Sequence, residues 1–192
     1  MKRTLIACNI FEDEMNDVLG RHKEFDVDTI WIGAGLHNDL NMMEGRLGEA
    51  LGKVTDGDGG VRIMLGHGCM PGLKELADGK GFPVLPFKNC LGALIGEDRL
   101  TELERDRTMV ITPAWIRKTW FAEDGIRAML GWDDTDFRMN FGRYDRLLVL
   151  DFGLNPLTDE ETLEAFSVIE VPIETEAMDL AHFERFFIGF LS

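Results

Sequence analysis

Three cysteines, each at the end of a short hydrophobic run, are the residues of this chain best placed to do chemistry. The runs cover residues 3–8 (RTLIAC), 61–69 (VRIMLGHGC) and 82–90 (FPVLPFKNC). Each run is typical of a buried strand that leads into a turn. Parallel strands end at a common sheet edge, where open α/β sheets bind ligands. We therefore expect the three thiols to share one site at this edge.

The residues expected at this edge form a set of metal ligands. Cys8, Cys69 and Cys90 are accompanied by His37 and His67, which lie in two of the expected turns. Soft thiolates favour zinc, copper(I) or iron–sulfur clusters. The chain has no CxxC pair, which excludes a zinc ribbon. Three ligands from separate turns instead predict a site with one position open or filled by a histidine, as in a catalytic zinc site or a substrate-binding cluster.

Other interpretations of the same cysteines stay open. A free cysteine often packs as a small hydrophobic residue, and Cys8, which follows Ile6 and Ala7, fits this description. Cys90 could instead be a nucleophile, because a helix N-terminus and Lys88 would stabilise its thiolate.

Two glycine-containing turns offer a second kind of site. Gly66 and Gly68 are followed by a third glycine one residue too late for the dinucleotide fingerprint, and the turn with Gly35 and Asn38 lacks that glycine altogether. Tight turns alone would explain these glycines. In the alternative, a small anionic ligand binds over them with Trp115 as a wall, and the protein is a binding module without metal.

Strand and helix patterns alternate along the whole chain. Apolar runs predict strands at 4–8, 25–33, 62–65, 82–86, 107–112, 146–152 and 168–173. Helical spacing predicts helices at 11–22, 39–54, 71–77, 89–105, 113–130 and 177–191, with a short helix after Thr158. Residues 132–144 are predicted to be a linker. The alternation predicts one α/β domain over residues 1–192, a three-layer, doubly wound, mostly parallel sheet of Rossmann-like or flavodoxin-like type.

The charge of the chain excludes several classes of partner. The 192 residues carry a formal net charge of −15. An acidic surface repels phosphate backbones and anionic membranes, so we expect neither nucleic-acid nor membrane binding. No apolar stretch is long enough to span a membrane, and the N-terminal residues are typical of a strand rather than a signal peptide. We expect a cytoplasmic protein with reduced thiols and no disulfides.

Five short blocks along the chain match the pattern of a known family. They are LIAC at 5–8, GLHN at 35–38, GHGC at 66–69, PFKNCLGALIG at 86–96 and TPAWI at 112–116. In order and spacing they resemble the uncharacterised domain-of-unknown-function family 1638. The three cysteine positions and His37 match that family. Lys88 stands where the family usually has a histidine, which weakens the expectation that position 88 supplies a ligand. His67 stands where the family typically has a tyrosine, and it could partly replace the missing histidine.

The resemblance implies a metabolic context rather than a specific activity. Members resemble cytosolic proteins of anaerobic and methyl-metabolising bacteria and are often encoded near corrinoid-dependent methyltransferases. By association this implies methyl-group or corrinoid chemistry, with a small molecule or a corrinoid-linked protein as the partner. The anaerobic setting and the separated cysteines favour an iron–sulfur cluster over zinc.

Whether the protein is an enzyme stays open, since neither a hydrolase carboxylate pair nor a GxSxG elbow is present. A subunit or chaperone of a methyltransferase would expose Phe183, Phe186, Phe187 and Phe190 on the last helix. We expect these side chains to be core and homo-oligomer contacts instead.

Overall fold

Parallel strands in two separate sheets form the framework of the protein. The structure, a computed structural model, describes residues 2–54, 60–123 and 125–192. The first sheet has the order β2-β1-β3 and the second the order β4-β5-β6, and every pairing is parallel. The strands are β1 (Arg3–Cys8), β2 (Val27–Ile32), β3 (Val61–Met64), β4 (Thr108–Ile111), β5 (Arg146–Asp151) and β6 (Ile173–Ala177).

Helices connect the strands and account for most of the remaining chain. The α-helices of the described residues are α1 (Glu12–Arg21), α2 (Leu40–Gly52), α3 (Leu73–Asp78), α4 (Cys90–Ile95), α5 (Glu97–Leu103), α6 (Pro113–Trp115), α7 (Ile126–Leu130), α8 (Asp134–Phe141), α9 (Asp159–Ile169) and α10 (Ala181–Leu191). Short 3₁₀-helices are η1 (Asn9–Phe11), η2 (Ala34–Asn38) and η3 (Arg105–Arg107), and η4 (Ile116–Trp120) is a π-helical turn. The α/β class with parallel strands is thereby confirmed.

The strands do not form the single continuous sheet that the sequence predicted. Residues 82–86, expected as a strand, make only an isolated bridge between Val84 and Ile63. Pro83 and Pro86 stand on either side of this bridge, and proline has no N–H to donate to a strand ladder. The segment therefore does not extend the first sheet beyond β3, and β4 begins a second sheet.

Two further boundaries differ from the predictions. Residues 168–172 are not a strand, because α9 continues to Ile169 and its C-cap residue Glu170 has a left-handed backbone (φ 54°). The last strand, β6, begins only at Ile173. The predicted linker 132–144 contains α8 instead. Its N-terminus is fixed by a capping box in which the Asp133 side chain accepts from the backbone and Asp136 reaches back to the Asp133 N–H.

Several helix ends follow the sequence signals. Asp39 caps α2, Asn89 caps α4, and Thr158 caps α9 in a capping box with Glu161. Gly96, with a φ of 87°, separates α4 from α5. These caps hold the starts of α2 and α4 beside the ends of the strands, where the site was expected.

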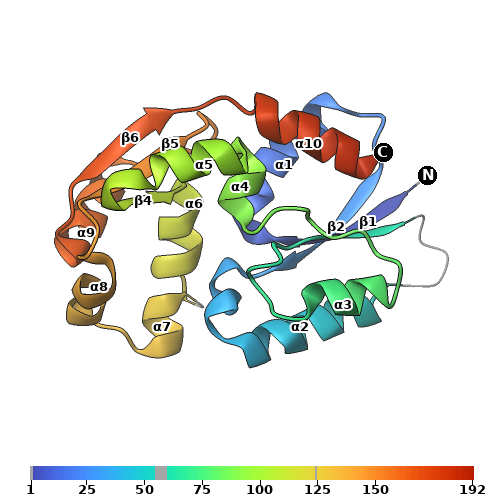
Figure 1. The fold of residues 1–192 in the computed structure, drawn as a ribbon, viewed down its shortest axis with the longest axis horizontal. Coiled ribbons are helices and arrows are strands. Elements are labelled where there is room, and N and C mark those ends of the chain that lie inside the picture. Colours follow the sequence, from blue (N-terminus) through green and yellow to red (C-terminus); the bar gives the residue numbers. More distant parts are fainter. Residues whose placement is uncertain (1, 55–59, 124) are drawn as a thin grey trace.

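Helices cover both faces of the first sheet (Figure 1). One of the two hydrophobic clusters on these faces also reaches the second sheet. On one face, α2 and α3 pack against Ile6 and Ile63. On the other face, α1 and α10 pack against Leu5 in a cluster that also contains Leu148 of β5. Phe183 and Phe187 are fully buried in this cluster, which confirms them as core residues, whereas a homo-oligomer contact stays a prediction. The two sheets therefore share this one cluster of apolar side chains.

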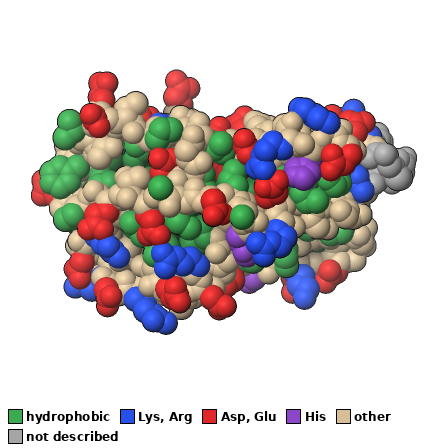
Figure 2. Space-filling model, turned by 90° about the horizontal axis from the view of Figure 1, so that it is seen from above, with side chains coloured by type: hydrophobic (Ala, Val, Ile, Leu, Met, Phe, Trp, Pro, Cys, Tyr) green, Lys and Arg blue, Asp and Glu red, His purple; other side chains and the backbone are tan. Residues whose placement is uncertain are grey.

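Charged side chains of both signs lie on the surface of the protein. Figure 2 shows acidic and basic side chains interspersed over one face rather than gathered by sign. Within the part of the chain that the structure describes, no helix is both long and apolar enough to cross a membrane.

Candidate functional site

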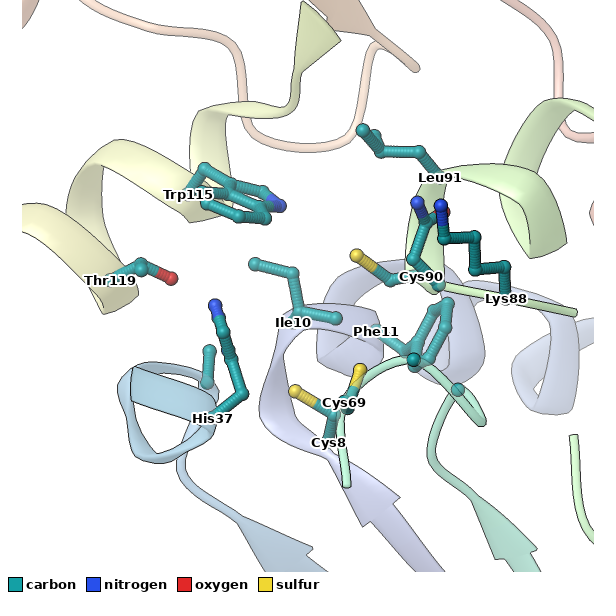
Figure 3. A pocket seen from close by; sticks show the side chains of 14 residues that line it. Cys8, Ile10, Phe11, His37, Cys69, Lys88, Cys90, Leu91, Trp115 and Thr119 are labelled. Carbon is teal, nitrogen blue, oxygen red and sulfur yellow. The ribbon is translucent and has the colours of Figure 1, made fainter. Parts of the chain in front are cut away.

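A cavity of about 210 Å³ lies beside the carboxyl edge of the first sheet, where η2, α4 and α6–η4 meet (Figure 3). All three cysteines face it, each from a different segment. Its lining consists of Cys8, Ile10, Phe11, Ala34, His37, Gly66, Gly68, Cys69, Lys88, Asn89, Cys90, Leu91, Trp115 and Thr119. The convergence of separate strand ends on one cavity is the arrangement that the sequence predicted.

The turn after β1 holds the two sides of the cavity together. The Asn9 side-chain oxygen accepts a hydrogen bond from the Ala34 N–H at 2.7 Å, which ties this turn to the turn after β2. The Lys118 ammonium on η4 donates to the Asn9 carbonyl at 2.9 Å and pairs with Glu12 at 2.6 Å. Cys8, at the end of β1, is thereby fixed against elements from both sheets.

The turn after β3 carries Cys69 and packs directly on the segment that carries Cys90. The Gly68 N–H donates to the Lys88 carbonyl at 2.8 Å, and the His67 N–H donates to Phe87 at 3.3 Å. A Cβ atom on Gly66 would lie 2.8 Å from the Asn89 Cα atom and even closer to the Lys88 oxygen. Glycine is therefore needed here so that the two backbones can approach.

The three thiols disfavour one another's ionisation. They are half-buried because they face the cavity, but surrounding protein still desolvates them. Burial is the main reason that the pKa of Cys90 is raised to about 12, and the charge of Cys69 raises it further. Burial, followed by the charge of Cys90, also raises the pKa of Cys8. Burial raises the pKa of Cys69 as well. Without a cation, all three are neutral thiols at pH 7.

The raised pKa argues against the interpretation of Cys90 as an activated nucleophile in the metal-free protein. Its pKa is raised rather than lowered, because desolvation outweighs its place at the start of α4. Lys88, which was expected to stabilise the thiolate, is exposed at the rim of the cavity.

Reaction with iodoacetamide tests the state of the thiols. We expect all three cysteines of the metal-free protein to react at pH 8 at least roughly tenfold more slowly than free cysteine, because burial and raised pKa values suppress the thiolate. Mass spectrometry of time points gives the rates. Protein unfolded in urea should react at the rate of free cysteine, and a cysteine that reacts rapidly in the folded protein would contradict the assignment.

Trp115 and His37 form the wall opposite the cysteines. Their ring centroids are 5.7 Å apart with planes inclined by 57°. The Trp115 indole N–H is close enough to Cys90 to lower the pKa of that thiol, although it does not reach hydrogen-bonding geometry with any described residue. Burial lowers the pKa of His37, opposed by a hydrogen bond with the Ala34 backbone, so that its imidazole is neutral at pH 7. Trp115 lines the pocket, as the sequence predicted, and Trp120 lies in the core.

The remaining predicted site residues are not with the cysteines. His67 is exposed and lines a separate hollow with Met70 and Phe82. Asn38 is exposed, and its side-chain amide donates to the Gly35 carbonyl at 2.9 Å. Gly35 is buried in η2 and is not part of the cavity lining.

Three consecutive N–H groups of the glycine-rich turn after β3 are used within the protein and are not free for a phosphate. The N–H groups of His67 and Gly68 donate to the 87–88 backbone, and the Cys69 N–H donates to Gly66 at 2.9 Å. An anion-binding turn needs such groups free and pointing at the ligand. The glycines therefore serve the packing of the cavity walls.

The sequence interpretation missed Thr119, which lies four residues after Trp115 and faces the same cavity. Residues four apart lie on one side of a helix, so this spacing was the available signal. The two side chains sit on the α6–η4 helix, whose π-helical turn is a feature often found at functional sites.

The donors around the cavity are not arranged for a single metal ion. Across residues 2–54, 60–123 and 125–192, no group of three or more His, Cys, Asp or Glu side chains could hold one as placed. The donor chemistry nonetheless suits a soft metal, since three thiols and one neutral imidazole line the same cavity.

Comparison with known proteins gives one match. The family model described as "Protein of unknown function (DUF1638)" matches residues 31–187. No curated protein and no solved structure matches the chain.

Proposed function

Because the chain belongs to the DUF1638 family, for which no activity is described, we propose its function from the cavity: the protein binds a soft metal centre through Cys8, Cys69 and Cys90. The convergence of three thiols from three separate segments on one cavity carries this proposal. Metals and clusters of this kind take thiolates as ligands. His37 is the candidate for a fourth ligand, since its imidazole is neutral.

The electrostatics of the site support a cationic occupant. Three thiolates cannot coexist there without a positive charge, because burial and mutual repulsion raise their pKa values. A metal centre supplies that charge and takes the place of the thiol protons. Binding should therefore release protons and become tighter as the pH rises.

Between the two candidate groups, the size of the cavity favours an iron–sulfur cluster over zinc. A zinc ion draws its sulfur ligands to about 2.3 Å, which leaves little space between them. The thiols here surround about 210 Å³ and, among the described residues, are not grouped around a single point. A cluster binds each thiolate through a different iron atom and so reaches ligands that are farther apart.

A link to methyl-group or corrinoid metabolism is part of the same proposal. The volume of the cavity limits which molecules of that metabolism could enter it. A cavity of about 150 Å³ accepts a molecule the size of benzene. A corrin ring is several times larger than benzene and does not fit within about 210 Å³. Any corrinoid would therefore be carried by a partner protein, and only a small group could reach the cysteines.

Metal analysis of anaerobically purified protein tests the proposal. We expect iron and sulfide in stoichiometric amounts and visible absorbance in the native protein, and neither in the Cys8→Ser, Cys69→Ser, Cys90→Ser triple variant. Stoichiometric zinc in a colourless protein would identify the metal centre as zinc instead of an iron–sulfur cluster. Thr112→Val is the matched control, since Thr112 is fully buried but lies outside the cavity lining.

Circular dichroism keeps the test decisive. If native protein and triple variant are both folded and neither contains metal, even after reconstitution with iron and sulfide, the proposed function is wrong.

A further inference from the structure

The Thr119 hydroxyl is a buried polar group without a hydrogen-bond partner in the described part of the chain. Thr119 is 0% exposed, and its Oγ1 atom has no hydrogen-bond partner among the described residues. The side chain lines the cysteine cavity, and Figure 3 shows its oxygen directed toward the space beneath Trp115. Buried hydroxyls in native structures nearly always have a partner, so an unpaired one that faces a cavity points to a ligand atom there.

The surroundings of this hydroxyl are apolar apart from one neutral ring. Ile10, Leu91 and the face of Trp115 provide hydrophobic walls. Figure 3 shows a His37 ring nitrogen directed toward the same space as the Thr119 oxygen. A molecule there would rest its carbon skeleton on the walls and direct one polar group at Thr119 and His37, as small-molecule sites usually require.

Charge and volume limit what that molecule is. Among the described residues that line the cavity, Lys88 is the one with a charged side chain, and it is exposed at the rim. In the metal-free cavity, an ionised ligand would therefore lose its hydration without a charged partner. In the metal-free protein, about 210 Å³ accommodates a molecule the size of benzene, for which about 150 Å³ suffices. A metal centre on the three cysteines would take part of this volume and leave room only for a smaller molecule.

We propose that the Thr119–His37–Trp115 side of the cavity binds a small, uncharged organic molecule that carries one hydroxyl or carbonyl group. The hydroxyl of Thr119 and the imidazole of His37 pair with that polar group, and its apolar part lies against Ile10 and Trp115. In this state His37 is not a metal ligand, and the three cysteines alone would hold the metal centre. This subsite adds a ligand class to the proposed function. It rests on that function only in placing the molecule next to the cysteines that would hold the metal centre.

Phenol and toluene are suitable probes, because they have nearly the same shape and differ in the hydroxyl group. Dissociation constants are measured by NMR titration of ¹⁵N-labelled protein, for wild type, Thr119→Val and Thr112→Val. Valine keeps the shape of threonine without its hydroxyl. Thr112 is the matched control, because its hydroxyl is equally buried and unpaired but lies away from the cavity.

We expect Thr119→Val to lower the preference for phenol over toluene roughly fivefold, the size of one hydrogen bond. Thr112→Val should leave the preference unchanged. The inference is overturned if phenol does not bind, if both variants change the preference equally, or if Thr119→Val leaves it intact. Benzoate binding as tightly as phenol would overturn the uncharged class.

Metal content is measured on the same samples, and the titration is repeated after chelation. Phenol binding that depends on Thr119 in metal-free protein would support the subsite even if the metal proposal fails. Stoichiometric metal without such binding would leave the metal site standing and remove the subsite.

Discussion

Replacing Gly66 with alanine is expected to destabilise the protein by about 3 kcal/mol, the cost of forcing an extra carbon into a packed interior. An alanine Cβ would lie 2.8 Å from the Asn89 Cα atom and closer still to the Lys88 carbonyl oxygen. Both are backbone atoms, so no side-chain rotation can relieve the overlap. The turn after β3 must move away from the 87–89 segment, and the hydrogen bond from Gly68 to Lys88 at 2.8 Å is strained or lost.

The same movement would separate two of the three thiols. Cys69 follows this turn and Cys90 follows the segment on which it packs. We therefore expect Gly66→Ala to lose bound metal as well as stability, in protein that is still folded at low temperature. The stability is measured by urea denaturation and the metal by elemental analysis of the same preparation.

Gly48→Ala is the matched control for this substitution. Gly48 is exposed on α2, and an added Cβ would meet nothing within 4 Å. Alanine there should stabilise the protein by about 0.5–1 kcal/mol, because alanine is the better helix former. If the urea midpoints of Gly66→Ala and Gly48→Ala coincide, the close approach at the cavity wall is not what the glycine provides.

The meeting of Cys8 and Cys69 could be predicted because it follows from chain direction alone, whereas Cys90 reaches the cavity through the packing of the 87–88 backbone on the turn after β3. Parallel strands bring their carboxyl ends to one edge. Cys8 is the last residue of β1, and Cys69 lies in the turn after β3 of the same sheet. The roles of the two histidines could not be separated in this way. Whether His37 or His67 faces the cavity depends on how each turn packs, and only His37 does so.

The division into two sheets could not be read from the pattern of apolar residues. Strand order depends on contacts between distant segments, whereas the pattern reports only local burial. Pro83 and Pro86 were a local signal that residues 82–86 would pair poorly. Residues 168–173 were wrongly predicted to be a strand for a related reason. Val168 and Ile169 are buried at the end of a helix, and Val171 is buried in the loop that follows. A short apolar run does not distinguish these cases from a strand.

Glu14→Gln is expected to stabilise the protein above neutral pH by up to about 3 kcal/mol, from 1.36 kcal/mol per pKa unit. Glu14 lies on α1, is 5% exposed, and its Oε2 atom has no hydrogen-bond partner in the described part of the chain. Burial, reinforced by the charge of Asp13, raises the pKa of its carboxyl from 4.5 to about 7. A hydrogen bond from its own backbone and the charge of Lys118 oppose this rise without cancelling it.

The direction of the pH dependence follows from the raised pKa. The folded protein keeps the Glu14 proton up to about pH 7, whereas the unfolded chain releases it near its ordinary value of 4.5. The contribution of Glu14 to stability is therefore full below pH 4.5 and is lost as the pH rises through 7. Glutamine has a similar shape and cannot ionise, so wild type and variant should differ little at pH 4.5 and most at pH 8.

Urea denaturation of both proteins between pH 4.5 and 8.5 measures this difference directly. Glu14→Ala separates charge from packing, because it leaves a small cavity at every pH while also removing the ionisable group. It should be less stable than Glu14→Gln by a similar amount throughout. A stability difference between wild type and Glu14→Gln that does not change with pH would show that the Glu14 carboxyl does not hold its proton in the folded protein.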